Sequence, residues 1–424
     1  MIFQKLAHRR LALGVVGCMR AAALIFAVSL GAANAASFVD PAIRPWTVTS
    51  VDPAQQDDSD LKAFAQAVGD ARVIALGEQT HGGREEFLLK TRLLKYLHEK
   101  LGFEVLLIES GFYDVGQLAA RMDAGAKLDD IASGNLFFMY ANSDEGRGLL
   151  RYLDQQKAKG KPLALAGIDS QHSGALSQAG LLTGLAAFLT DKRSSLAQGV
   201  DWQNYADLAQ ALFKLQRQAP TPDRQAAFGR VSKDLQKELC ASSDTARFGS
   251  QWWCQVVRSV QSQATSYWSG GRDYQRDNQM GANAIWLADH LFAGKKTVIW
   301  AHTVHVARGF QRSPQNLQAG EVMHRQWGTK YKVVQFSAAR GAILDFSNMQ
   351  PLDIGAAQVP SLEANLAKAG YRLAGMTANF AVELPQFTFE YATHPIETGL
   401  QGRLGINWDV LFFMDTVHPV HMSR

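Results

Sequence analysis

Short apolar runs alternate with amphipathic stretches along most of this chain of 424 residues, and this alternation limits the folds that it can adopt. Five runs have the length and composition of buried strands: residues 73–76, 105–108, 163–166, 297–300 and 332–336. Between them, apolar residues recur with helical spacing at 84–99, 146–159 and 276–292. Apolar strands that alternate with amphipathic helices are typical of a parallel sheet covered on both faces. We therefore predict an α/β fold with a mostly parallel central sheet and helices on both of its faces.

Two regions depart from this alternation. Residues 175–270 are rich in Gln and Ala and have helical spacing, so we expect a large helical insertion within a main domain that spans residues 36–424. After Gly341 the chain returns to strand-like segments, among them residues 380–384 and 410–414.

The first 35 residues have the features of a signal peptide. Their four charged residues are all basic, and an apolar run over residues 21–33 ends at the sequence Ala33-Asn34-Ala35. The run is too short for a membrane anchor. A lipoprotein signal that ends at Cys18 is the alternative interpretation. We expect export and cleavage near Ala35, which makes the mature protein periplasmic or secreted, with no stable membrane insertion.

Charge and cysteine content limit the partners. The chain has 43 basic and 39 acidic residues, and removal of residues 1–35 leaves 39 of each sign. A balanced charge predicts no nucleic acid partner and no anionic membrane surface as a partner. Cys240 and Cys254 remain after cleavage, and they form either a disulfide in an oxidising compartment or two separate buried thiols. No pattern indicates an oligomeric state.

Polar, titratable residues follow four of the five predicted strands. In chain order they are Glu78 and His81, Glu109, Asp169, and His302 and His305. Because the carboxyl ends of parallel strands lie at one edge of a sheet, where ligands bind in open α/β folds, we expect these side chains to share a cleft.

Each of these residues also has a structural interpretation. Glu78 can complement the N-terminus of the following helix, and we expect Asp169 to cap a helix rather than to act in catalysis. Glu109 and His302 end apolar strands, where a polar group needs a partner, and this favours a functional role or a buried ion pair.

Common catalytic and nucleotide-binding signatures are absent from the sequence: there is no G-x-S-x-G, no H-E-x-x-H, no P-loop and no G-x-G-x-x-G. Histidine, carboxylate and arginine remain, and together they can activate water and stabilise an oxyanion.

Four ordered segments resemble the erythromycin esterase family. They are GEQTHG at 77–82, LLIES at 106–110, RDNQMGAN at 276–283 and WAHTVHVARG at 300–309. With weaker matches at 140–153, 167–171 and 409–415, the resemblance covers most of residues 70–415. It implies hydrolysis of an ester, such as the macrolactone of a macrolide in antibiotic resistance, by a histidine-activated water without metal or cofactor. An exported chain makes an envelope or environmental ester an alternative substrate.

The resemblance also implies residue roles by position. His81 would be the general base, and Glu78, Glu109 and His302 would complete the catalytic set. Contacts to the small-molecule ester substrate would come from Arg276, Lys90 and His305.

Two other functional classes remain open. The first is a metal-dependent hydrolase, whose ligands would be Glu78, His81, Glu109, His302 and His305. The second is a haem- or iron-binding protein of the cell envelope, because distant relatives of this fold are linked to haem and iron uptake.

Overall fold

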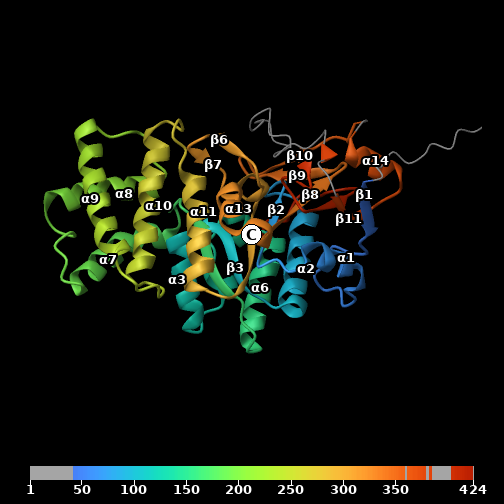
Figure 1. The fold of residues 1–424 in the computed structure, drawn as a ribbon, viewed down its shortest axis with the longest axis horizontal. Helices are drawn as coiled ribbons and strands as arrows, with labels where there is room; N and C mark the ends of the chain where they lie inside the picture. Colours follow the sequence, from blue (N-terminus) through green and yellow to red (C-terminus); the bar gives the residue numbers. More distant parts are fainter. Residues whose placement is uncertain (1–41, 359–360, 379–381, 384–402, 424) are drawn as a thin grey trace, which may run out of the picture. The chain divides into compact units, whose positions relative to one another are not determined.

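An eight-stranded sheet organises the fold (Figure 1). The computed structural model describes residues 42–358, 361–378, 382–383 and 403–423, and these belong to one compact unit, Phe38–Arg424. Six neighbouring strands of the sheet, from β14 to β4, are parallel, whereas β11 pairs antiparallel with β14 and with β1. This arrangement confirms the predicted α/β class.

The spatial order of the strands is β1-β11-β14-β8-β2-β5-β3-β4. Their bounds are β1 Ile43–Thr47, β2 Val73–Glu78, β3 Phe103–Gly111, β4 Ala164–Asp169, β5 Lys296–His302, β8 Tyr331–Ala338, β11 Leu373–Ala378 and β14 Val410–Met414. The five predicted apolar runs are the neighbouring strands β8, β2, β5, β3 and β4, and residues 410–414 are β14.

Side chains of the parallel strands alternate between two buried clusters. In β2, Val73 and Ala75 face one cluster, whereas Ile74 and Leu76 face the other. Both faces of the parallel part of the sheet are therefore buried, as is typical of parallel sheets. Helices α11 (Arg276–Trp286), α13 (Ala319–Trp327) and α14 (Leu362–Lys368) contribute to the first cluster, and α1 (Lys62–Val68), α2 (Arg84–Leu101) and α6 (Asp144–Ala158) to the second.

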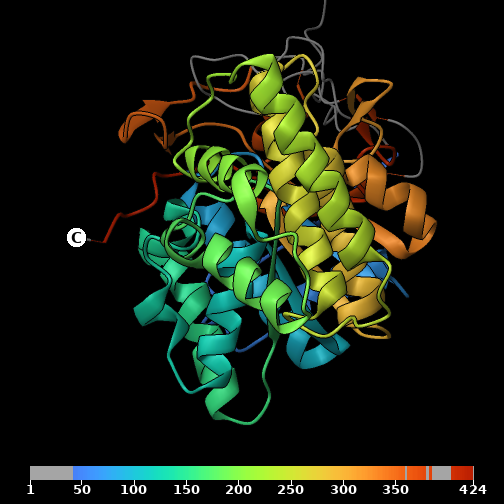
Figure 2. The same cartoon turned by 90° about the vertical axis from the view of Figure 1, so that its left-hand side faces the viewer.

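Four helices form the insertion that the fold prediction contained: α7 (Ala175–Asp191), α8 (Gly199–Phe213), α9 (Pro222–Cys240) and α10 (Ser250–Trp268). Figures 1 and 2 show them packed side by side, and they contact the rest of the fold through α3 (Phe112–Asp123) and α11. A disulfide joins Cys240 and Cys254, and so links α9 to α10. Of the two alternatives for these cysteines, the structure contains the disulfide.

Two predicted segments differ in detail. The helix expected over 276–292 is α-helical only to Trp286, and Leu287–Leu291 form a π-helical turn. In this wider turn the N–H of Phe292 donates to the carbonyl of Leu287, five residues earlier, at 2.8 Å. Within residues 380–384, Val382–Glu383 form the short strand β12, and the rest of this segment lies outside the described residues, as does the predicted signal peptide.

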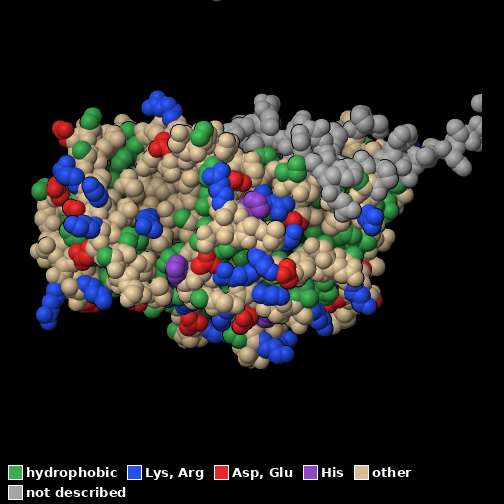
Figure 3. Space-filling model, in the orientation of Figure 1, with side chains coloured by type: hydrophobic (Ala, Val, Ile, Leu, Met, Phe, Trp, Pro, Cys, Tyr) green, Lys and Arg blue, Asp and Glu red, His purple; other side chains and the backbone are tan. Residues whose placement is uncertain are grey.

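Smaller elements complete the described chain. They are the helices α4 (Leu128–Ile131), α5 (Phe138–Asn142) and α12 (Thr303–Val306), and the strands β6 (Gln311–Ser313), β7 (Asn316–Leu317), β9 (Ala342–Asp345), β10 (Gln350–Asp353) and β13 (Arg403–Leu404). Over the described ranges, no helix combines the length and apolar character that a membrane span needs. On the face shown in Figure 3, basic and acidic side chains are interspersed.

The turn after β2 is held by segments from distant parts of the chain. The carbonyl oxygen of Gly82 accepts the N–H of Leu344 at 3.1 Å and that of Val420 at 3.0 Å. A Cβ at Gly82 would lie 1.9 Å from the Leu344 carbonyl oxygen, so only glycine fits here. Two positions further on, the N–H of Arg84 donates to the carbonyl of His418 at 2.8 Å, which ties the C-terminal segment to the start of α2.

Candidate active site

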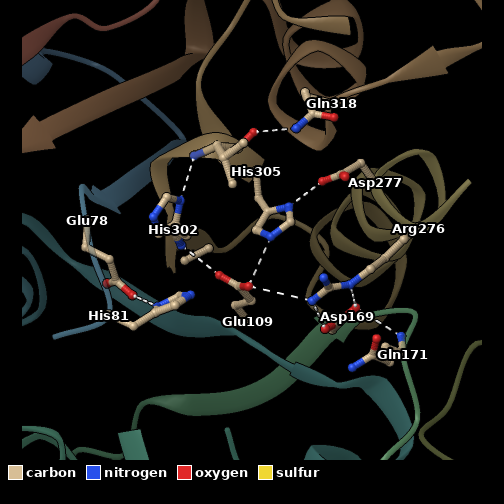
Figure 4. Close-up of polar contacts among 12 residues, drawn as sticks. Glu78, His81, Glu109, Asp169, Gln171, Arg276, Asp277, His302, His305 and Gln318 are labelled. Atoms are coloured by element: carbon tan, nitrogen blue, oxygen red, sulfur yellow. Dashed lines mark hydrogen bonds and ion pairs between the residues drawn. The ribbon is translucent and has the colours of Figure 1, made fainter. Parts of the chain in front are cut away.

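The ends of four adjacent strands form one edge of a cavity with a volume of about 520 Å³. Glu78 and His302 are paired in register at the ends of β2 and β5, and Glu109 and Asp169 lie near the ends of β3 and β4. Figure 4 shows these side chains converging. The structure thus brings together residues that are up to 224 positions apart, as 78 and 302 are. Of the predicted site residues, the cavity is lined by His81, Glu109, Arg276, His302 and His305.

Glu78 and His81 form a carboxylate–imidazole pair beside the cavity. Nδ1 of His81 lies 2.8 Å from Oε1 of Glu78, and the Tyr140 hydroxyl donates to the same oxygen at 2.7 Å. Burial acts to raise the pKa of Glu78, but the charge of Lys90 and the hydrogen bond from His81 outweigh it and lower that pKa. The ionised carboxylate therefore keeps the proton on Nδ1, which leaves the opposite ring nitrogen, Nε2, as the basic one.

Lys90, which was expected to contact the substrate, lies away from the cavity. Its side chain is fully buried, forms an ion pair with Oε2 of Glu78, and lies 4.1 Å from the centre of the Trp300 ring. It does not line the cavity. Helix α2 packs against the face of β2 that carries Ile74 and Leu76, so Lys90 reaches Glu78 from that face of the sheet and not through the cavity. This geometry does not support the predicted substrate contact, and Lys90 instead supports the carboxylate that orients His81.

Glu86 holds the backbone of the same turn. Its Oε2 accepts the N–H of Gln79 at 2.9 Å and the N–H of Thr80 at 3.4 Å. Burial, and after it the charge of Glu78, raise the pKa of Glu86 to about 8. A neutral carboxyl group thus fixes the residues between Glu78 and His81. The sequence analysis did not identify this residue, because a glutamate in the first turn of a helix is common.

His302 lies against His81, with 4.9 Å between the ring centres, but both of its nitrogens are occupied. Nδ1 accepts the N–H of Val304 at 3.1 Å, so Nε2 carries the proton and donates to the carbonyl of Gln79 at 3.0 Å. Burial, then the charge of His81, lower the pKa of His302 to about 3. A neutral imidazole without a free nitrogen is not placed to transfer a proton. This geometry supports a positioning role for His302 rather than the predicted catalytic one.

Glu109 lies at the centre of a second charged cluster (Figure 4). Its Oε2 accepts the backbone N–H of His302 at 2.7 Å, and its Oε1 lies 3.1 Å from Nε2 of His305. Nδ1 of His305 pairs with Asp277. Although burial lowers it, the charges of Asp277 and Glu109 raise the pKa of His305 well above its usual value. His305 is thus an imidazolium between two carboxylates. Burial acts to raise the pKa of Glu109, but His305, His81 and Arg276 together keep that pKa well below its usual value.

Arg276 faces the cavity from the start of α11. Its Nε and Nη2 donate to the two oxygens of Asp169, at 2.9 and 2.6 Å, and Nη2 also lies 3.7 Å from Oε1 of Glu109. The side chain keeps 22% of its surface exposed. The expected role of Asp169 as a helix cap is wrong, because its oxygens bind this guanidinium and the N–H of Gln171 (2.9 Å).

Aromatic side chains surround the His81 ring. Phe137, Phe346 and Tyr140 have ring centres 4.6, 5.3 and 5.9 Å from that of His81. Tyr140 is the first residue of the weaker match at 140–153, and Asp277 lies in the segment at 276–283. These resemblances were the sequence signals for the two residues. No sequence pattern indicated Phe346, which reaches the site from the segment after β9.

The donor set does not fit a metal ion well. The described part of the chain has no group of three or more His, Cys, Asp or Glu side chains arranged as metal ligands. Both nitrogens of His302 bind backbone groups, and both nitrogens of His305 bind carboxylates. These bonds would have to break before either imidazole could bind a metal.

Curated proteins with similar sequences include two named enzymes. The chain is 26% identical over 276 residues to the predicted hydrolase YbfO of Bacillus subtilis, a match that covers 61% of each protein. It is 33% identical over 115 residues to an erythromycin esterase type II of Escherichia coli, which covers 27% of each. The chain therefore matches less than two thirds of the length of either relative.

Solved structures show the same fold. A Bacillus cereus protein has a TM-score of 0.70 at 20% identity over 90% of this chain and 97% of its own. A succinoglycan biosynthesis protein has a TM-score of 0.66 at 18% identity, covering 89% and 95%. A mutant of the erythromycin esterase EreC in its open conformation has a TM-score of 0.62 at 16% identity, covering 88% and 98%.

A family model described as erythromycin esterase matches residues 98–421, which is more than half of the chain. The match includes Glu109, Arg276 and His302 but begins after the turn that carries Glu78 and His81, whose pairing rests on the geometry above. Together with its relatives, the match supports a hydrolase. This chain belongs to the erythromycin esterase family.

Proposed function

We propose that the protein hydrolyses a carboxylic ester through a water molecule that His81 activates. The carrying observation is the ionised Glu78 behind His81, which leaves Nε2 as the basic nitrogen of a residue that lines the cavity. A carboxylate that orients an imidazole in this way is the arrangement of a general base.

The proposed reaction has two steps. In the first, Nε2 of His81 takes a proton from water, and the hydroxide adds to the ester carbonyl to give a tetrahedral oxyanion. Glu109 accepts the second hydrogen of the water and orients it. Arg276, a partly exposed cation that lines the cavity next to Glu109, stabilises the oxyanion. In the second step, protonated His81 gives its proton to the leaving alkoxide, and a carboxylic acid and an alcohol are released.

The substrate class and the location are also proposals. The E. coli relative is named an erythromycin esterase, and this supports a macrolactone as one substrate to test, beside other esters. Export to the periplasm or beyond is supported by the signal-like residues 1–35 and by the Cys240–Cys254 disulfide, because disulfides persist in oxidising compartments.

Hydrolysis is tested with the purified mature protein against macrolides, simple acyl esters and peptides. With the best ester, His81→Ala should lower kcat by about 10² or more while the circular dichroism spectrum stays unchanged. The matched control is His290→Ala, since His290 is exposed and does not line the cavity. Full esterase activity in His81→Ala would contradict the proposal.

The same protein tests the two other classes. A metal-dependent hydrolase would lose activity with a chelator and regain it with added zinc or manganese. A haem-binding protein would give a Soret band on haem titration and would hydrolyse no ester.

A further inference from the structure

A second cavity, with a volume of about 410 Å³, adjoins the active-site cavity on the side of the helical insertion. The two cavities share Gln171, Arg217, Tyr274 and Arg276, so a ligand bound beside His81 can extend from one into the other. The second cavity continues beyond the end of α10, along Tyr267 and Gly270. The proposed reaction does not use this space.

The second cavity carries positive charge without an acidic residue to balance it. None of the described residues that line it is Asp or Glu, whereas two are arginines. Asp169 neutralises one of them, Arg276, through a two-point contact. The other, Arg217, lies beyond the end of α8, is exposed, and forms no ion pair with a described residue. Arg217 therefore provides the uncompensated charge of this cavity.

Arg217 is held in place by an aromatic side chain. Its guanidinium carbon lies 5.1 Å from the centre of the Tyr267 ring. The Tyr267 hydroxyl donates to Oε1 of Gln171 at 2.8 Å, which fixes the ring against the wall that both cavities share. A guanidinium that lies over an aromatic ring can still donate N–H groups to two oxygens of a carboxylate or phosphate.

We propose that this second cavity is a subsite for an anionic group, a carboxylate or a phosphate, which the substrate carries at a distance from its ester bond. Arg217 is the residue that recognises this group. The inference rests on the proposed ester hydrolysis and adds the class of substrate that the site prefers.

The test compares 4-nitrophenyl esters that differ only in the far end of the acyl chain. Each ester is made with a terminal carboxylate, a terminal phosphate and a terminal hydroxyl. The acyl chain is made in several lengths, so that the length whose far end reaches Arg217 can be found. At the best length, kcat/KM for one or both anionic esters should exceed that of the hydroxyl ester about tenfold. The preferred anion distinguishes a carboxylate subsite from a phosphate subsite.

Arg217→Gln should remove this preference by lowering kcat/KM of the preferred anionic ester to about that of the hydroxyl ester, and Arg217→Lys should restore part of it. The matched control is Arg230→Gln, since Arg230 is also an exposed arginine but lies on α9 and lines neither cavity. Equal kcat/KM for all three ends, or a preference that survives Arg217→Gln, would overturn the subsite while leaving ester hydrolysis intact.

Absence of any hydrolysis would instead count against the proposed function. In that case each ester is replaced by its amide analogue, which the protein does not hydrolyse. The affinity of these amides for wild type and for Arg217→Gln is then measured by calorimetry, which makes the same comparison without turnover. Equal affinity for charged and uncharged analogues would overturn the subsite by this second route.

Discussion

Replacing Glu86 by glutamine should make the stability of this protein less dependent on pH. Burial raises the pKa of Glu86 from its ordinary value of 4.5 to about 8 in the folded chain. The folded protein thus binds this proton more tightly than the unfolded chain does. The resulting stabilisation is complete below about pH 4.5 and is lost as the pH rises toward 8.

The size of this effect follows from the shift in pKa. One pKa unit corresponds to about 1.36 kcal/mol, so between about pH 4.5 and 7 the wild type loses roughly 3 kcal/mol of unfolding free energy through this group. Glutamine does not ionise, and its oxygen can still accept the N–H groups of Gln79 and Thr80. Its NH₂ group would replace Oε1, which has no hydrogen-bond partner among the described residues. This mismatch costs about 1–3 kcal/mol at every pH.

The diagnostic quantity is therefore a difference that changes with pH. The unfolding free energy of Glu86→Gln minus that of wild type should rise by roughly 3 kcal/mol from about pH 4.5 to 7. Urea unfolding followed by tryptophan fluorescence at several pH values measures it. Glu104→Gln, at an exposed position, should leave the difference flat. A flat difference for Glu86→Gln as well would show that Glu86 is ionised in the folded protein and refute the reasoning.

Further predictions concern the supports of the site. Lys90→Met should lower kcat at least tenfold in steady-state kinetics with little change in KM, because Lys90 touches Glu78 and not the cavity. In urea unfolding, the same change should destabilise the fold by about 3–5 kcal/mol. His302→Gln should leave the shape of the pH–rate profile unchanged, since both nitrogens of His302 bind backbone groups; a lost limb in that profile would assign it a proton-transfer role. Reduction of Cys240–Cys254, which are 14 positions apart, should lower stability by about 3 kcal/mol but preserve ester turnover by the folded protein. Removal of residues 417–424 should lower kcat, because Val420 and His418 bind the turn of Gly82 and Arg84; unchanged turnover by the shortened chain would contradict this.

The sequence was sufficient for the parallel part of the sheet and for the edge where the site lies, whereas the antiparallel strands β1 and β11 were not predicted. Runs such as Val73 to Leu76 are apolar at every position and alternate with amphipathic stretches, which favours strands buried on both faces, and this property is local. From four of the five predicted strands the chain continues into a polar, titratable residue. Parallel pairing then places Glu78, Glu109 and His302 at one edge, whatever the order of the strands.

The roles of individual side chains depended on contacts between distant segments. Lys90 has helical neighbours that predict only a buried face, and the direction from which α2 approaches β2 decides that it meets Glu78 rather than the cavity. The state of His302 depends on the Gln79 carbonyl, 223 positions away. Asp169 binds Arg276, 107 positions away, instead of capping a helix.

Hydrogen bonds and ion pairs act over a few ångströms, so the protonation of each group depends on which partner the fold brings within that range. Apolar periodicity is set by neighbours in the chain, and it therefore determined the strands, the helices and the position of the site. The charged His305 was decided by Asp277 and Glu109, which lie on other elements, and the neutral Glu86 by burial, and only the tertiary structure supplies these.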